Sequence, residues 1–260
     1  AVPPPADWKQ LREFSLSEAA GFLGVTPSNL KKLHLENKGP QPNVHSNGRR
    51  AYSAQNIADL RAYLNLHGRT ESKQYDPSRR AGDKLQVIAV ANAKSSSGKT
   101  ALCAHLVQHL ALSGHRVLAI DLDPKASMTR LFGISADHVP DVSVATAMGT
   151  NKAGAEAILN DAMVETAFPR LSLLPASPDL HDAERQVLAT IRGGLTGQPG
   201  GEPWLQLKRV LALVETRFDV VVIDCPPRLG IMTLAALFAA TAVLIPVSSN
   251  MSELAELARF

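Results

Sequence analysis

Residues 85–100 read Leu85-Gln86-Val87-Ile88-Ala89-Val90-Ala91-Asn92-Ala93-Lys94-Ser95-Ser96-Ser97-Gly98-Lys99-Thr100, and this stretch decides the fold. Its first part, Leu85 to Ala91, is an apolar run rich in β-branched residues, which predicts a strand buried on both faces. Small residues follow, and then the helical run Ala101 to Leu112. In this order, a strand, a small-residue loop and a helix N-terminus bring backbone N–H groups and the helix dipole to a phosphate. The stretch therefore predicts a loop that binds the phosphates of a nucleotide.

Two residues at the end of the loop have the chemistry that such a site needs. Lys99 can neutralise the β and γ oxygens of a triphosphate, and the Thr100 hydroxyl can ligate Mg²⁺. The strict glycine-rich pattern fails at its first position, which is Ala93. A serine-rich run alone would also fit a flexible linker, so the prediction depends on the flanking strand and helix. The expected nucleotide-binding residues are Lys94, Ser95, Ser96, Ser97, Gly98, Lys99, Thr100 and Ala101.

Four further apolar runs alternate with helical stretches after the loop. Continuous apolar runs fit strands covered on both faces, and the intervening helices fit crossover connections between parallel strands. The sequence therefore predicts an α/β domain with a parallel sheet. The segment Gly193 to Pro203 is rich in glycine and proline and predicts a surface loop. The four runs are Val117 to Ile120, Leu171 to Leu174, Val220 to Ile223 and Ala242 to Val247.

Acidic residues end two of the predicted strands. Val117 to Ile120 runs into Asp121-Leu122-Asp123-Pro124, and Val220 to Ile223 runs into Asp224-Cys225-Pro226-Pro227. Carboxylates at the C-terminal ends of parallel strands point into the crevice where α/β sheets bind ligands, and there they can hold Mg²⁺ or orient water. An aspartate in this position can also cap the next turn or helix. Because both motifs accompany a phosphate loop, we favour the functional interpretation.

These motifs together resemble the ParA partition ATPase family over Val87 to about Pro246. Lys94 followed by Gly98-Lys99-Thr100 resembles the family's deviant Walker A motif, and Asp121-x-Asp123-Pro124 resembles the acidic motif that follows it. Asp224-Cys225-Pro226-Pro227 is similar to the Walker B motif. The resemblance implies an ATP-dependent sandwich homodimer that binds DNA and a ParB-type partner protein, with ATP and Mg²⁺ as cofactors. It also implies association with the nucleoid, and the cytoplasm is the expected location because the chain has no signal-peptide pattern.

The same resemblance implies roles for single residues. Lys94 would be the signature lysine that reaches the nucleotide of the partner subunit, and Asp123 would position the attacking water, so both would serve catalysis. Lys99 and Thr100 would bind phosphate and Mg²⁺. Asp224 would be the outer-sphere Mg²⁺ residue.

The chain departs from the family pattern at three positions. Ser95 and Ser96 stand where the family has two glycines, and Lys125 stands where it has glutamine. If either loop position requires a positive φ, a serine there costs roughly 1 to 2 kcal/mol, and its side chain could crowd the phosphates. Serine is small and can donate to phosphate, so nucleotide binding can survive. Hydrolysis needs tighter geometry, since a misplacement of about 1 Å can cost on the order of 100-fold in rate.

The first 67 residues have a different pattern. Amphipathic stretches predict helices at Leu16 to Leu23, Pro27 to Glu36 and Ala54 to Leu66, and the segment Gly39 to Tyr52 predicts a loop and wing. This part resembles the MerR-like winged helix-turn-helix, whose second helix enters the major groove. The alternative is a three-helix protein-interaction domain with solvated basic residues. The predicted N-caps are Ser15, Thr26 and Ser53; the expected DNA contacts are Ser28, Asn29, Lys31, Lys32, Arg49 and Arg50; and Leu30 and Tyr52 are expected in the core.

Charge is distributed unevenly along the chain. Residues 1–83 carry 12 Lys and Arg against 8 Asp and Glu, whereas residues 84–260 carry 15 against 16. A basic N-terminal part suits DNA phosphate. We expect a helix-turn-helix domain at 1–67, a polar linker at 68–83 and a P-loop ATPase domain at 84–260. The chain ends one helix beyond the last predicted strand, so we expect the ATPase domain to be cut short at its C-terminus.

Composition also disfavours several classes of function. No apolar run approaches the roughly 18 to 20 uncharged residues of a membrane helix, so no membrane partner is expected. Cys103 and Cys225 each lie inside an apolar element and predict buried thiols. Metabolic relatives of the fold that carry an iron-sulfur cluster, such as nitrogenase iron proteins, are therefore disfavoured.

Two functions fit these observations. The first is a plasmid or replicon partition ATPase that also regulates its own operon. The second is a nucleotide-switched transcriptional regulator whose degenerate loop hydrolyses ATP poorly. The first is favoured by the intact Lys94, Lys99, Thr100, Asp123 and Asp224, and the second by Ser95, Ser96 and Lys125.

Overall fold

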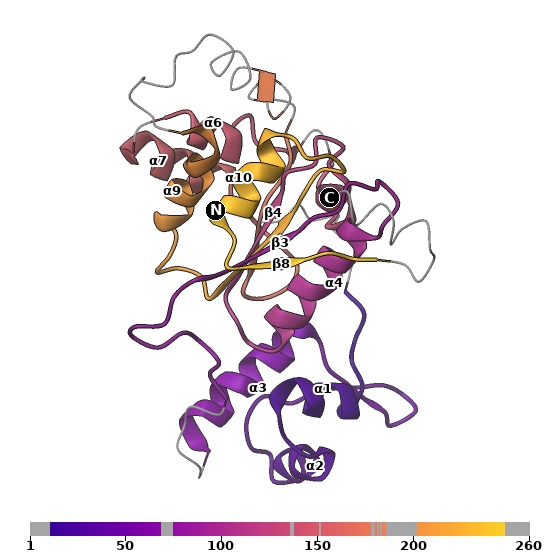
Figure 1. Cartoon of the computed structure of the whole chain (residues 1–260). Helices are drawn as coiled ribbons and strands as arrows, with labels where there is room; N and C mark the ends of the chain where they lie inside the picture. The colour runs from indigo at the N-terminus through magenta and orange to yellow at the C-terminus, as the bar shows by residue number, and fades with distance from the viewer. Residues whose placement is uncertain are drawn as a thin grey trace.

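The fold begins with a small N-terminal module of helices and one hairpin. The computed structural model describes residues 11–68, 75–135, 138–150, 152–177, 180, 182, 184–185 and 202–247. Figure 1 shows the module beneath the rest of the molecule. Its elements are α1 (Leu16–Leu23), α2 (Pro27–Leu35), the antiparallel strands β1 (Asn43–Val44) and β2 (Arg50–Ala51), and α3 (Ala54–His67).

Side-chain caps begin the three helices at the residues that the sequence predicts. The hydroxyls of Ser15, Thr26 and Ser53 each accept the backbone N–H of the residue three positions on. Helix α1 ends at Gly24, whose φ of 68° is the left-handed conformation that glycine adopts without steric cost. The predicted helix boundaries are confirmed to within one residue. The module is therefore built from strong local signals.

A mostly parallel sheet forms the centre of the remaining chain. Its strand order among the described residues is β5-β6-β4-β7-β3-β8, in which the β5–β6 pair is antiparallel and the other pairs are parallel. The predicted α/β class is confirmed. Strands formed by the predicted apolar runs are β3 (Gln86–Val90), β4 (Val117–Asp121), β6 (Leu171–Leu174), β7 (Val220–Asp224) and β8 (Ala242–Leu244).

The sheet differs from the prediction at two places. Strand β8 ends at Leu244 and not at Val247, because Pro246 has no N–H with which to continue the ladder. Strand β5 (Val164–Glu165) was not predicted, because two residues are too short to show a strand pattern. Residues 193–201 of the expected surface loop lie outside the described residues, and Pro203 begins a short 3₁₀ helix, η3 (Pro203–Leu205).

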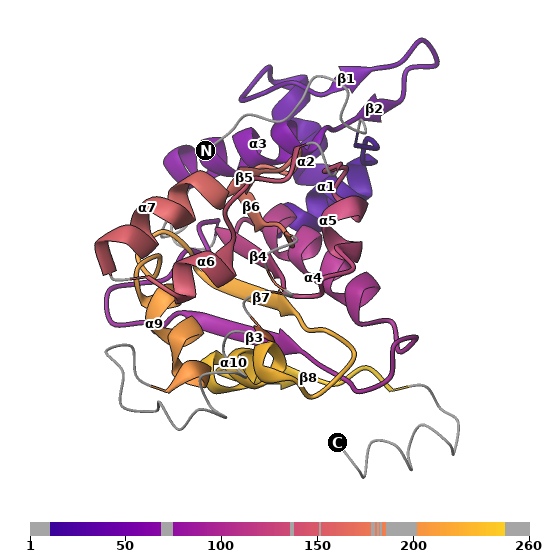
Figure 2. The same ribbon diagram turned by 90° about the horizontal axis from the view of Figure 1, so that it is seen from above.

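Helices cover both faces of the sheet, as Figures 1 and 2 show. Because successive side chains of a strand point to opposite faces, each strand serves two cores. Val221 and Ile223 of β7 face one helical layer, whereas Val222 faces the other. Among the described residues, the first layer includes α6 (Val144–Met148), α7 (Lys152–Ala162), α9 (Gln206–Ala212) and α10 (Ile231–Ala239), and the second includes α4 (Lys99–Leu112) and α5 (Ser127–Leu131).

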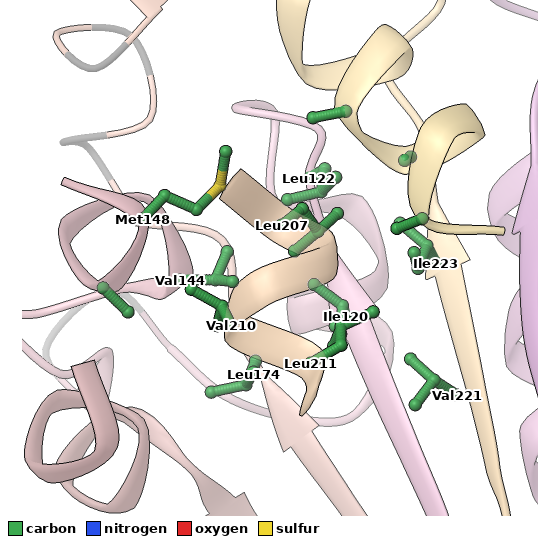
Figure 3. Packing of buried hydrophobic residues seen from close by; sticks show 14 of the residues in the cluster. Ile120, Leu122, Val144, Met148, Leu174, Leu207, Val210, Leu211, Val221 and Ile223 are labelled. Atoms are coloured by element: carbon green, nitrogen blue, oxygen red, sulfur yellow. The ribbon is translucent and has the colours of Figure 1, made fainter. Parts of the chain in front are cut away.

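Figure 3 shows the packing of the first layer. Leu207, Val210 and Leu211 of α9 lie against Ile120 of β4 and Leu174 of β6. All five side chains are less than 5% exposed. This apolar contact fixes β4, whose C-terminal end bears one of the two acidic motifs.

The second core is shared between the sheet and the N-terminal module. Leu23 and Leu60 of the module belong to the same buried cluster as Cys103 and Val107 of α4. Residues 75–83 also contact both parts: Tyr75 is buried in this cluster, and the backbone N–H of Arg79 donates to Asp219 at 3.0 Å. The N-terminal module is thus packed against α4 and the sheet through a shared core. No helix among these described residues is long and apolar enough to cross a membrane.

Arg61 of α3 connects the module to the end of α4. Its buried guanidinium donates to the carbonyl oxygens of Tyr75 at 3.2 Å and Leu112 at 3.1 Å, and also to that of Phe22. Phe22 and Leu112 lie in the last turns of α1 and α4, where carbonyl groups lack partners within the helix. Burial lowers the pKa of Arg61 to about 10. A side chain at Gly114 would collide with this guanidinium, so the contact leaves no room for a larger residue.

Candidate functional site

The predicted phosphate loop, residues 91–98, joins the C-terminal end of β3 to the first turn of α4. Gly98 is the N-cap of α4 and has a φ of 82°, a left-handed conformation that favours glycine. No described side chain caps this helix, so the N–H groups of its first turn can bind an anion. Lys99 and Thr100 are the first two residues of α4. The strand, loop and helix therefore have the order that the sequence predicts.

Lys99 folds over the loop. Its side chain is buried, and Nζ donates to the carbonyl oxygen of Lys94 at 2.6 Å and to Ser97 Oγ at 3.3 Å. Burial lowers the pKa of Lys99, whereas the carboxylates of Asp224 and Asp123 act in the opposite direction. Oxygen atoms of the loop therefore accept the hydrogen bonds that phosphate oxygens would accept from this ammonium group when a nucleotide is bound.

The two serines that replace the family's glycines have ordinary backbone conformations. Among the described residues other than glycine, a positive φ occurs at Asn37, Ala126 and Arg170. Ser95 and Ser96 are not among them, and both are exposed. The backbone penalty considered for the serines therefore does not arise in this loop. Crowding of a phosphate by their side chains is the remaining way in which they could slow hydrolysis.

Asn92 anchors the loop, a role that the sequence motifs did not indicate. It is buried directly after β3, and its Nδ2 donates to the carbonyl oxygen of Pro246 at 2.8 Å. Its Oδ1 accepts the backbone N–H of Lys94 at 2.9 Å. The one signal in the sequence is a polar residue immediately after a buried strand.

Asp121, at the end of β4, fixes the start of α5. Its Oδ2 accepts the backbone N–H of Thr129 at 2.9 Å and the Thr129 hydroxyl at 2.7 Å. The Thr129 hydroxyl oxygen in turn accepts the backbone N–H of Ala176 at 2.9 Å. Burial raises the pKa of Asp121 to about 6, although the bonds from Thr129 act to lower it. This carboxylate holds the fold together, a role that its motif does not indicate.

Asp224, at the end of β7, is buried, and neither of its carboxylate oxygens has a well-formed hydrogen bond to another described residue. Burial raises its pKa to about 7, and the neighbouring carboxylates of Asp121 and Asp123 add to the rise. The Thr100 hydroxyl and Lys99 lie close enough to oppose it. A buried, unsatisfied carboxylate beside a hydroxyl and two further carboxylates is a place where a hard divalent cation fits. Thr100 and Asp224 are the residues suited to hold Mg²⁺, directly or through water.

Asp123 lies in a tight turn between β4 and α5. Its Oδ1 accepts the backbone N–H of Lys125 at 3.0 Å, and its own N–H donates to Asp121 at 3.1 Å. Ala126, three residues on, has φ and ψ of 52° and 38°, a left-handed conformation that is costly for alanine. The structure thus gathers the proposed catalytic and metal residues at one edge of the sheet, and it holds the acidic turn in a strained conformation. Such strain is found at functional sites.

The two cysteines are free and buried, as the sequence predicts. Cys103 lies one turn after Lys99 on α4, and Cys225 follows Asp224. Burial raises the pKa of both thiols, that of Cys225 to about 12. Protonated thiols are poor metal ligands. Within the described part of the chain, no three His, Cys, Asp or Glu side chains are placed to hold a metal ion by themselves, so a cation beside Asp224 would also need oxygens from Thr100, water or a nucleotide.

The residues predicted to contact DNA lie at the other end of α4 from the phosphate loop (Figure 1). Four of them lie along α2 and two on the β1–β2 hairpin. Leu30 and Tyr52 are fully buried, which confirms their predicted place in the core. The exposed residues are Ser28, Asn29, Lys31, Lys32 and Arg49, and Arg50 is half-buried.

Three comparisons with known proteins agree with this architecture. Residues 85–260 match the protein family described as AAA domain. A putative replication protein A from Sinorhizobium fredii is 46% identical over 99% of this chain, and the chromosome partitioning protein ParA of Myxococcus xanthus is 32% identical over 62%. The chain spans 62% and 52% of the lengths of these relatives. Among solved structures, cobyrinic acid a,c-diamide synthase from Mycobacterium smegmatis, with bound ADP and magnesium, is 35% identical with a TM-score of 0.55, covering 67% of this chain and 66% of its own.

Proposed function

This chain belongs to the ParA-type family of P-loop ATPases, and from that premise we propose that it binds ATP with Mg²⁺ and hydrolyses it as the partition ATPase of a plasmid or replicon. One observation carries the proposal. Asp224 is buried and unsatisfied among the described residues, beside Lys99 and Thr100 at the mouth of a phosphate loop. That arrangement leaves one carboxylate and one helix N-terminus in need of a partner, and a magnesium nucleotide satisfies both.

The geometry supports a division of labour among five residues. Lys99 would leave the loop oxygens and bind the β and γ phosphates, while Thr100 and Asp224 would hold Mg²⁺. Asp123, fixed by its turn, would orient the attacking water. Lys94, whose backbone N–H is held by Asn92, would serve the nucleotide of a second subunit, as the resemblance to the family implies. Bound Mg²⁺ would neutralise charge that develops on the phosphates.

Dimerisation and DNA binding belong to the same proposal. The exposed lysines of α2 and Arg49 on the hairpin provide charge for DNA phosphate, and α2 is free of the core on the side that they occupy. We infer that the protein dimerises on ATP binding, binds its own operator and non-specific DNA, and is stimulated by a ParB-type partner.

The second candidate is a transcriptional regulator that uses the nucleotide as a switch. Ser95 and Ser96 at the phosphate loop favour it, but their unstrained backbones remove one reason for slow turnover. A steady-state assay of phosphate release from Mg²⁺-ATP, with and without duplex DNA, separates the two. Turnover that DNA stimulates supports the ATPase, whereas tight binding without turnover supports the switch.

A further inference from the structure

A cavity lies between the N-terminal module and the sheet, and none of its lining residues belongs to the phosphate loop. Its volume is about 460 Å³, within the roughly 300 to 1,000 Å³ of small-molecule sites. Residues of α1 and of the segment before it form one wall, and α4, α5 and the β5–β6 turn form the others. Figure 2 shows α1, α4 and α5 in one group, and the ring centroids of Phe22 on α1 and His109 on α4 are 5.8 Å apart.

The floor of the cavity is aromatic. Phe14 packs edge-on against Phe22 with 5.6 Å between ring centroids, and Phe132 packs edge-on against Phe168 with 6.4 Å. Phe14, Phe132 and Phe168 are each less than 10% exposed, so the surrounding core holds their rings in place. Rigid aromatic walls bind an apolar body of similar size with little loss of side-chain freedom.

The rim of the cavity has the opposite character. Arg12, His105, Gln108 and His109 reach it, and no aspartate or glutamate occurs among the described residues that line it. His105 and His109 are four residues apart on α4, which places them on one side of the helix. The Arg12 guanidinium is 4.4 Å from the centroid of the Phe14 ring and is paired with Glu18, which lies outside the lining. The described lining of the rim therefore has hydrogen-bond donors and no carboxylate, and one of the donors, Arg12, also binds the Glu18 carboxylate from outside the cavity.

We propose that this cavity is a binding site for a small aromatic acid. The ring system would lie against Phe14, Phe132 and Phe168, and the anionic group, a carboxylate or an equivalent oxyanion, would accept from Arg12 and His105. An apolar pocket with a few convergent donors at its mouth is the usual form of such sites. The ligand would contact both the module and the sheet, so binding would hold the two parts together.

The site also connects to the phosphate loop through two helices. Thr129 of helix α5 donates to Asp121, and the cavity residue Phe132 follows the last residue of that helix. Helix α4 carries His105 about 1.7 turns after Lys99. An effect of the ligand on nucleotide chemistry would rest on the proposed function. Binding itself does not, and it is therefore tested on nucleotide-free protein.

The test uses two dyes that share one ring system. The probe 8-anilinonaphthalene-1-sulfonate carries an anionic group, and N-phenyl-1-naphthylamine has the same rings without it. Fluorescence titration of the whole chain is expected to saturate at one sulfonate dye per chain. The exposed rim residue Ala167 is small, so Ala167→Trp should fill the cavity and weaken binding at least about tenfold. Ala157→Trp, an equally exposed substitution on α7, is the matched control and should bind as the native chain does.

A charge variant completes the test. Arg12→Gln combined with His105→Gln should weaken binding of the sulfonate dye about tenfold and leave binding of the neutral dye unchanged, since only the sulfonate group accepts hydrogen bonds from the Arg12 guanidinium and the His105 ring. Equal loss for both dyes would overturn the anion part of the proposal. If Ala167→Trp fails to fold by circular dichroism, Gln108→Trp on α4 fills the same cavity. Native dye binding by a folded filling variant would place the dye elsewhere and overturn the site.

Discussion

Asp121 and Asp224 lie directly opposite each other on the neighbouring strands β4 and β7. The carboxylate of Asp121 accepts well-formed hydrogen bonds, whereas that of Asp224 accepts none from the described residues. Both carboxyls are buried, and burial raises the pKa of Asp121 to about 6 and that of Asp224 to about 7. The same residue type thus has two different roles. One carboxylate holds the chain together, and the other is suited to an incoming ligand.

The first prediction concerns pH and stability without nucleotide. Because the folded pKa of Asp224 exceeds its unfolded value, the folded state binds more protons between about pH 4 and 7. The stabilisation that this carboxyl contributes is therefore complete below about pH 4 and is lost as pH rises to about 7. Asp224→Asn should raise the free energy of unfolding at about pH 7.5 by on the order of 1 to 3 kcal/mol. Urea unfolding at about pH 5.5 and about pH 7.5 measures it.

Asp121→Asn is the matched variant for that experiment. Its amide can accept fewer of the three donors from Asp123 and Thr129, so it should lower the unfolding free energy by about 1 to 3 kcal/mol. If the two substitutions change the free energy of unfolding equally, the two carboxyls do not have different structural roles.

The second prediction concerns the two lysines of the loop. Lys99→Ala should abolish Mg²⁺-ATP binding, because it removes the buried ammonium from the mouth of the loop. Lys94→Ala should keep binding within a few-fold and lose hydrolysis, since its proposed target is the nucleotide of another subunit. Calorimetry and phosphate release measure the two properties. Unchanged affinity in Lys99→Ala would remove the phosphate-loop assignment.

The third prediction concerns the serines. Because Ser95 and Ser96 have unstrained backbones, Ser95→Gly with Ser96→Gly has no strain to release. The double variant should hydrolyse ATP within about twofold of the native rate and bind it equally well. A gain of tenfold or more, about 1.4 kcal/mol of barrier, would instead reveal crowding of the phosphates and favour the regulator.

A fourth prediction concerns duplex DNA. Lys31→Ala with Lys32→Ala should weaken binding of the whole chain and lower the slope of log affinity against log salt by about one for each DNA phosphate that is no longer neutralised. The control is Lys152→Ala with Lys208→Ala, which removes two exposed lysines from α7 and α9 on the far side of the molecule. Fluorescence anisotropy at several salt concentrations tests both. Equal weakening of DNA binding by the two pairs of substitutions would indicate general electrostatic attraction, and not a specific contact of α2 with DNA.

The fifth prediction uses the strained turn after Asp123. Ala126→Gly should raise the unfolding free energy by about 1 kcal/mol, because glycine adopts a φ of 52° without steric cost. Ala157→Gly, exposed in the middle of α7, should lower it by about 1 kcal/mol through backbone entropy. Because both variants make the same Ala→Gly change, opposite signs of the change in unfolding free energy would show that the effect comes from the backbone conformation. A loss at both positions would argue against the left-handed conformation of Ala126.

Sequence patterns predicted those parts of the fold that depend on local chemistry. Five strands were predictable because each is a continuous apolar run, and three helices because a hydroxyl residue caps each one. Strand β5 escaped because it is two residues long. The roles of Asn92 and Arg61 could not be predicted, because their partners, Pro246 and Leu112, lie far away in the chain. Tertiary hydrogen bonds of this kind leave no periodic signal.

The site was predictable to the same degree. Asp224 ends strand β7, and Lys99 and Thr100 begin helix α4, which follows the neighbouring strand β3, so the order of motifs places the three residues at the same edge of the sheet. The separate role of Asp121 depends on Thr129, eight residues on, and on burial that no motif encodes. The absence of strain at Ser95 likewise depends on how the loop is threaded between Asn92 and Gly98.

Helix α4 has one end at the phosphate loop and the other under Arg61. Its 14 residues span about 21 Å, and a hydrogen-bonded helix of that length is stiff along its axis. An axial displacement of Lys99 would therefore be transmitted along the helix to the carbonyl of Leu112, which accepts from the Arg61 guanidinium. Helix α4 is thus a rigid mechanical connection between the phosphate loop and the N-terminal module.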